Sequence, residues 1–92
     1  MAKVPIRIKR CVREGNYFVS QHCRKELADD GFMVQDAIAA IVSSVECDIF
    51  TDDESHIRYK LYGHARDGKA LDVVVTMHQE KLILKTAYES FR

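Results

Sequence analysis

The stretch His56-Ile57-Arg58-Tyr59-Lys60-Leu61-Tyr62-Gly63-His64 decides the fold of this chain. Its even positions hold His, Arg, Lys, Tyr and His, and the apolar and aromatic residues Ile, Tyr and Leu stand between them. Because successive side chains of a β-strand point to opposite faces, this pattern predicts a strand with one packed face and one polar, mostly cationic face. Such a strand is typical of an antiparallel sheet that helices cover on one side.

Three more strands are predicted around this stretch. Val45–Phe50 precedes it, and the Val-rich run Leu71–Met77 and the final run Leu82–Tyr88 follow it. Short polar turns separate the four strands, and the connection Arg66-Asp67-Gly68-Lys69 has the glycine that favours a tight hairpin. The sequence therefore predicts four consecutive antiparallel strands.

Three helices are predicted before the strands, over Ile6–Glu14, Ser20–Asp29 and Met33–Ser44. Gly15 and Gly31 end the first two, and Ser20 is a suitable N-cap. The third helix has the clearest apolar stripe, which consists of Val34, Ala37, Ile38, Ile41, Val42 and Val45. The element order predicts an α+β fold, in which two or three N-terminal helices pack on one face of a four-stranded antiparallel sheet. Residues 1–92 are expected to form a single domain.

The composition of the 92 residues, 47% apolar and 30% charged, is typical of a soluble globular protein. The longest apolar run, Ala37–Val42, is far below the length of a membrane span. Met1–Pro5 lacks the apolar segment of a secretory signal. We therefore expect a cytoplasmic protein with no membrane partner. Its three cysteines are widely separated and form no zinc-ligand spacing, so we expect reduced thiols, no metal and no cofactor.

The formal net charge is zero, but the charges are segregated along the chain. Residues 1–25 contain seven Lys or Arg and one acid, a balance of +6. Residues 26–54 contain nine acids and no Lys or Arg, and residues 55–92 contain seven bases and four acids. A nucleic-acid-binding protein is typically basic overall, so only a local patch of this chain is expected to attract RNA.

Five residues are candidates for a catalytic site. Arg58 and Lys60 share the predicted cationic face, and His78 of the next strand joins them if it points the same way. Such a group is suited to hold a phosphodiester and to stabilise its developing charge. His22, at the start of a helix, is a candidate base, and Tyr88 is a candidate proton donor. The alternatives are a solvated sheet face, a structural histidine and a packed tyrosine.

The order of these segments resembles a bacterial and archaeal domain-of-unknown-function family, number four-two-five-eight. The resemblance covers Ile6 to Ser90 and depends on Phe18-Val19-Ser20-Gln21-His22, Arg58-Tyr59-Lys60-Leu61-Tyr62-Gly63 and Leu84-Lys85-Thr86-Ala87-Tyr88-Glu89. Such domains look like distant relatives of the RelE- and BrnT-type ribonuclease toxins, which cleave messenger RNA without a metal. The resemblance implies functional roles for His22 and Tyr88, with Arg58 and Lys60 on the strand that supplies basic residues.

Two functions follow as hypotheses. The first is a metal-independent, toxin-type endoribonuclease that cleaves mRNA, in which His22 or His78 acts as acid or base. The second is a non-catalytic protein-interaction module of the same fold, which uses its acidic stretch 46–54 and its open sheet edges. The partners consistent with these hypotheses are RNA, a cognate antitoxin or another protein, and a second copy of the chain.

Overall fold

The structure is a computed structural model that describes residues 1–91, which form three helices and a six-stranded sheet. The helices are α1 (Ile6–Arg13), α2 (Gln21–Asp29) and α3 (Val34–Ser43). The strands are β1 (Ala2–Lys3), β2 (Tyr17–Val19), β3 (Glu46–Thr51), β4 (Ile57–His64), β5 (Ala70–His78) and β6 (Lys81–Glu89). The α+β class and all three predicted helices are confirmed.

The sheet has the strand order β1-β3-β4-β5-β6-β2. The four predicted strands form its centre as an antiparallel meander, β3 to β6. The prediction of four antiparallel strands is incomplete, because two short strands extend the sheet. β1 pairs antiparallel with β3, and β2 pairs parallel with β6. Strands of two and three residues are too short to show an alternating pattern, so only their long-range partners reveal them.

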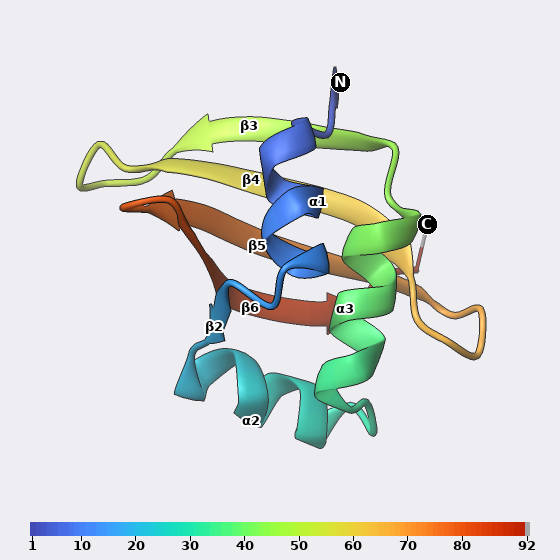
Figure 1. The fold of residues 1–92 in the computed structure, drawn as a ribbon. Coiled ribbons are helices and arrows are strands. Elements are labelled where there is room, and N and C mark those ends of the chain that lie inside the picture. Colours follow the sequence, from blue (N-terminus) through green and yellow to red (C-terminus); the bar gives the residue numbers. More distant parts are fainter. Residues whose placement is uncertain (92) are drawn as a thin grey trace.

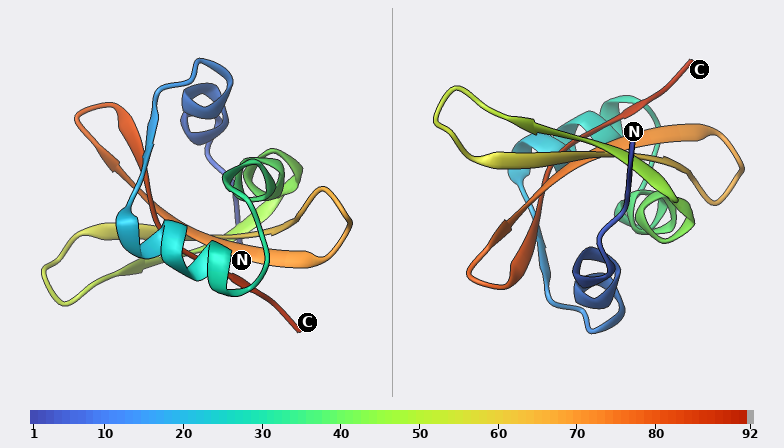
Figure 2. Two further views of the ribbon diagram at one scale, coloured as in Figure 1. Left: turned by 90° about the horizontal axis from the view of Figure 1, so that it is seen from below. Right: turned by 90° about the horizontal axis from the view of Figure 1, so that it is seen from above.

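The helices do not all cover one face of the sheet. α1 and α3 lie over the same face, whereas α2 lies beside β6 at the edge of the sheet (Figures 1 and 2). The core fills the space between α1, α3 and the sheet. Its fully buried side chains include Ile8, Ile41, Leu61, Val73 and Leu84. None of the helices in residues 1–91 is long and apolar enough to cross a membrane.

The apolar stripe of α3 is narrower than its sequence suggests. Ala37, Ala40 and Ile41 are fully buried, but the side chain of Val42 is 57% exposed and Val45 is exposed as well. Val42 and Val45, the last two members of the predicted stripe, therefore do not face the core. Each helical residue turns about 100° from the one before it, so Val42 lies beside the face that Ile41 turns to the sheet.

Gly63 allows β4 and α3 to approach closely. A Cβ atom built on this glycine would lie 1.8 Å from the backbone oxygen of Ala40, which is far inside van der Waals contact. The helix backbone therefore rests directly on the strand at this position. This contact fixes the end of β4 beneath α3 and leaves the other face of β4 uncovered by α1 and α3.

Two carboxylates, from Glu26 of α2 and from its C-cap Asp30, cover the outer edge of β6. β2 pairs with β6 only as far as Leu84, and beyond that point the backbone N–H groups of Ala87 and Glu89 point outward. Glu26 accepts a hydrogen bond from the Ala87 N–H, and Asp30 accepts one from the Glu89 N–H. The helix thus satisfies an edge that would otherwise be open to another strand.

Candidate functional site

The alternation predicted for β4 is confirmed. Tyr59, Leu61 and Gly63 are buried on the helical side, and Arg58 and Lys60, with Tyr62, are half-buried between them. The two basic side chains therefore lie on the face of the sheet that α1 and α3 leave open. The alternation of apolar and polar residues in the sequence predicted this placement. A shift of one residue would have exchanged the two faces of the strand.

Lys60 and Tyr88 lie together in the middle of this open face. The Nζ atom of Lys60 is 5.5 Å from the ring centre of Tyr88 and 5.6 Å from that of Tyr62. A hydrogen bond to Tyr88 raises the pKa of Lys60 above its usual value. The same Nζ atom is 4.0 Å from the Oδ2 atom of Asp72, a residue only 3% exposed. The charge of Lys60 is thus largely compensated inside the protein.

Carboxylates outnumber cations around Lys60. Asp48, directly opposite Lys60 on β3, accepts a short hydrogen bond from the Tyr62 hydroxyl, and this bond raises the pKa of Tyr62. Asp72 lies beneath the lysine, and Glu26 accepts a hydrogen bond from Thr86 further along the face. A phosphate placed beside Lys60 would meet two carboxylates, those of Asp48 and Asp72, and one lysine. The middle of the open face is therefore poorly suited to bind an anion.

His22 lies at the seam between α2 and β6. Its side chain is 70% exposed, and its Nε2 atom is 3.3 Å from the Oε1 atom of Glu26. The same Glu26 oxygen accepts hydrogen bonds from the Thr86 hydroxyl and the Ala87 N–H. Ser20 caps the helix by accepting a hydrogen bond from the Cys23 N–H. His22 thus contacts the carboxylate that joins the helix to the sheet.

Arg58 lies at the start of β4, where Asp52 binds its guanidinium. The Nη2 atom of Arg58 is 2.6 Å from the Asp52 Oδ2 atom, and its Nε atom donates to the same oxygen. The pKa of Asp52 is lowered to about 2, first by the hydrogen bond from the His56 N–H and then by those from Arg58 and Glu54. Asp52 is therefore ionised at any physiological pH, and it fixes the direction of the guanidinium.

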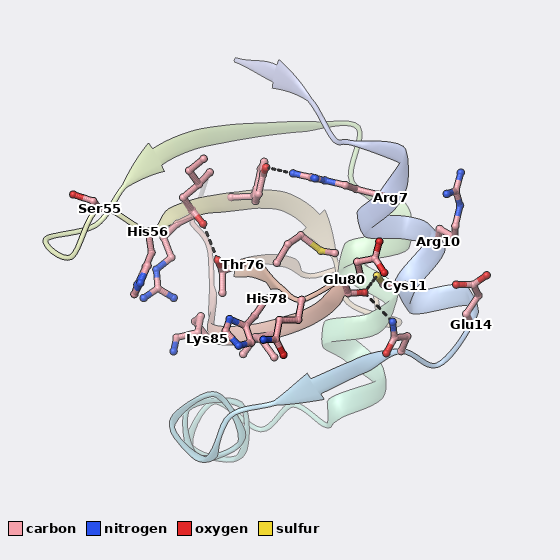
Figure 3. Close-up of a pocket in the computed structure, with 17 residues that line it drawn as sticks. Arg7, Arg10, Cys11, Glu14, Ser55, His56, Thr76, His78, Glu80 and Lys85 are labelled. Atoms are coloured by element: carbon pink, nitrogen blue, oxygen red, sulfur yellow. Dashed lines mark hydrogen bonds between the residues drawn. The ribbon is translucent and has the colours of Figure 1, made fainter.

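A cleft opens where β4 and β5 separate. Their paired residues end at Tyr59 and Val75, and beyond this pair the Thr76 hydroxyl donates to the backbone oxygen of Ile57. The β5–β6 hairpin and α1, from Arg7 to its C-cap Glu14, complete the walls (Figure 3). The cleft has a volume of about 910 Å³. It is lined by Arg7, Arg10, Cys11, Glu14, Asn16, Ser55, His56, Ile57, Arg58, Tyr59, Thr76, Met77, His78, Gln79, Glu80, Ile83 and Lys85.

The cleft is richer in cations than the middle of the open face. Four basic side chains and two imidazoles line it against two carboxylates, and these are Arg7, Arg10, Arg58, Lys85, His56, His78, Glu14 and Glu80. Arg7 enters from α1 and donates a 2.9 Å hydrogen bond to the Tyr59 hydroxyl, which carries no compensating charge (Figure 3). Arg58 alone among the four basic residues has a carboxylate partner in an ion pair within the described chain.

A β-bulge supplies one of these cations. Val75 pairs with Leu84 and Val74 with Thr86, so Lys85 is an extra residue in β6. A bulge redirects side chains, and here both Lys85 and Thr86 are half-buried between the fully buried Leu84 and Ala87. In Figure 3, Lys85, His56 and His78 lie on the side of the cleft opposite α1.

The five candidate residues thus occupy three places. Arg58 and His78 both line the cleft, Lys60 and Tyr88 lie together in the middle of the open face, and His22 lies at the α2–β6 seam. Sequence analysis missed Arg7, Arg10, His56 and Lys85 as cleft residues. The polar face of α1 was a usable signal for the two arginines, because it flanks the apolar stripe of Ile8, Cys11 and Val12. No local signal marked the bulge at Lys85.

An α+β domain with an open sheet face and a cationic cleft is the class of protein that these features define. The chain belongs to a family described as Domain of unknown function (DUF4258), whose model matches residues 19–89. Neither the curated proteins nor the solved structures give a match to this chain. Among residues 1–91, no group of three or more His, Cys, Asp or Glu side chains is arranged to hold a metal ion.

Proposed function

We propose that this protein is a metal-independent endoribonuclease that binds single-stranded RNA in the cleft between β4, the β5–β6 hairpin and α1. The observation that carries the proposal is the set of four basic side chains and two imidazoles around one cleft of about 910 Å³. Phosphodiester cleavage needs cations for the developing negative charge and groups that transfer protons. The sequence motifs of the family look like those of distant relatives of the RelE- and BrnT-type toxins, which cleave mRNA without a metal, and this expectation motivates the choice of reaction.

In the proposed reaction, the 2′-hydroxyl of a ribose attacks the adjacent phosphorus. The 2′-oxygen forms a bond to phosphorus, and its proton passes to the neutral imidazole of His78. The bond between phosphorus and the 5′-oxygen breaks, and the imidazolium of His56 gives a proton to that oxygen. Arg58, held in place by Asp52, and Lys85 bind the non-bridging oxygens. The products are a 2′,3′-cyclic phosphate and a free 5′-hydroxyl.

The other three candidate residues have roles outside this cleavage step. Lys60 and Tyr88 lie in the part of the open face where carboxylates disfavour a phosphate, so we assign them no phosphate contact, and the ring of Tyr88 is a stacking surface for an unpaired base. His22 is exposed at the seam and is available to a flanking nucleotide. The charge of Lys60 is compensated by Asp72, and His22 lies outside the cleft. We therefore expect Lys60→Ala and His22→Ala to lower activity less than changes in the cleft.

The test is cleavage of a fluorescent single-stranded RNA by purified protein in the presence of EDTA. His78→Ala is expected to lower the rate about a hundredfold or more, the usual size of a general acid–base contribution. The matched control is His64→Ala, which removes an exposed histidine at the other end of the sheet. The rate of the wild type should show a bell-shaped pH dependence. Expression of the wild type should slow cell growth, and His78→Ala should relieve this effect.

Two results would overturn the proposal. One is wild-type protein that leaves RNA intact and is harmless when expressed. The other is His78→Ala protein that cleaves RNA as fast as His64→Ala protein. The first result favours the alternative function, a non-catalytic domain of the same fold that binds a protein partner.

A further inference from the structure

The outer edge of β3 is open to another strand. β1 pairs only with Glu46 and Cys47, and from Asp48 to Thr51 no strand within residues 1–91 lies on that side. Figure 1 shows β3 at the border of the sheet, opposite the border that β2 and α2 cover. A strand edge presents unpaired N–H and C=O groups to any extended segment that lies beside it. Carboxylates of α2 and its C-cap satisfy the β6 edge, but nothing within residues 1–91 covers the β3 edge in this way.

Apolar side chains flank this edge on both faces of the sheet. Ile49 is 53% exposed and Phe50 is 43% exposed, and as neighbours in a strand they point to opposite faces. Ile57 on β4 is also more than half exposed, and it lies diagonally across from Ile49 on the same face. A strand added at this edge would bury apolar surface above and below the sheet in addition to forming backbone hydrogen bonds.

The edge and the turn after it are strongly acidic. Residues 46–54 contain five carboxylates and no basic residue, namely Glu46, Asp48, Asp52, Asp53 and Glu54. Only Asp52 has partners in ion pairs of the described chain, the guanidinium of Arg58 and the imidazole of His56. The hydroxyl that bonds to Asp48 carries no charge. A segment that approaches this edge therefore meets a negative potential, which favours lysine and arginine.

The same charges argue against a second copy of the chain as the occupant. Two β3 edges paired antiparallel would bring two sets of these five carboxylates together. Like charges on neighbouring strands destabilise the pairing, and no basic residue of β3 would compensate them. The surface is therefore complementary to a cationic partner rather than to itself.

We propose that the β3 edge at Asp48–Thr51 binds an extended, cationic segment of another protein, which adds a strand to the sheet. Lysine or arginine side chains of the segment lie against the acidic residues 46–54, and its apolar side chains contact Ile49 and Phe50. The proposal does not depend on ribonuclease activity, because the backbone that pairs, Asp48–Thr51, contributes no residue to the lining of the cleft.

The test uses a short synthetic peptide that alternates lysine and valine, and a matched peptide that alternates glutamate and valine. With isotope-labelled full-length protein, the lysine peptide should shift the NMR signals of Asp48–Thr51 and slow amide exchange there about tenfold. Ile49→Lys should weaken binding about tenfold or more, because it replaces an apolar contact with a like charge. Val42→Lys is the control, since it changes an equally exposed valine on α3, and it should alter the affinity less than about twofold. Added salt should weaken binding.

Other outcomes would overturn the proposal. One is equal binding of both peptides. Another is a set of shifted signals that lies outside β3 and its neighbours. A third is no binding at all by the lysine peptide. Light scattering measures whether a second copy of the chain binds this edge instead. If the wild type is a dimer and Ile49→Lys is a monomer, a second copy and not a cationic partner binds the β3 edge.

Discussion

Replacement of Gly63 by alanine tests the close contact between β4 and α3. The added Cβ atom would lie 1.8 Å from the backbone oxygen of Ala40, 2.5 Å from its carbonyl carbon and 2.8 Å from its Cα atom. Ordinary contact begins at 3.4 Å, so the helix and the strand would have to separate by about 1.6 Å at this point. The atoms in the way belong to the backbone, and a change of side-chain rotamer cannot make room.

We expect Gly63→Ala to lower the free energy of unfolding by about 3 kcal/mol, the upper part of the usual range for overpacking. For a domain of this size, that loss lowers the melting temperature by roughly 12–24 °C. Urea unfolding followed by circular dichroism measures the change directly. A second change, Ala40→Gly, should not restore stability, because the clash involves the backbone of residue 40 and not its methyl group.

Gly68→Ala is the matched control for this prediction. Gly68 has no atom within 4 Å of the position of an added Cβ, but its φ of 90° lies in the left-handed region. Its replacement should cost about 1–2 kcal/mol through backbone strain alone. If Gly63→Ala destabilises the protein no more than Gly68→Ala, β4 and α3 are not in direct backbone contact and the reasoning is refuted.

Three further predictions concern ionisable side chains. Asp36 accepts hydrogen bonds from the N–H of Met33 and from the side chain of Arg66. The bond from Arg66 is the main reason that the pKa of Asp36 is lowered to about 2. Asp36→Ala should therefore lower the free energy of unfolding by about 2 kcal/mol at pH 7. The carboxylate contributes this stability above its unfolded pKa near 4 and loses it as the pH falls through about 2, so urea unfolding at pH 2 should show little difference from wild type. Burial raises the pKa of Cys23 to about 11, and its thiol should react with an alkylating reagent at pH 8 only after the protein is unfolded, as mass spectrometry would show. Asp52→Asn should weaken the contacts that hold the β3–β4 turn, and amide exchange should become faster there but not in the β4–β5 turn.

The α+β class could be predicted from sequence because local patterns specify it. Residues 56–64 alternate strictly, and this alternation alone placed Arg58 and Lys60 on the open face. Gly15 and Gly31 ended the first two helices at nearly the right positions, and both adopt positive φ. Periodicity and chain-terminating residues act over a few neighbours, so they can be read without knowledge of the rest of the molecule.

The candidate site could be predicted only in part. Arg58 and His78 line one cleft, as expected of residues on adjacent strands, but the local charge of each position depends on partners far away in the sequence. Asp72 approaches Lys60 from β5, and Asp52 binds Arg58 across the turn. The bulge at Lys85 exists because β5 and β6 change register, and neither strand shows this change by itself.

The sequence by itself determined which residues form helices and central strands and which side of β4 is packed, because these properties depend on spacing within one segment. Only the tertiary structure decided that β2 joins β6, that carboxylates from α2 cover that edge while β3 stays open, and that a cationic cleft forms where β4 and β5 separate. Each of these features requires segments distant in sequence to meet in one register. The free energy of these long-range contacts depends on all the groups that come together, and no single stretch of the chain contains that information.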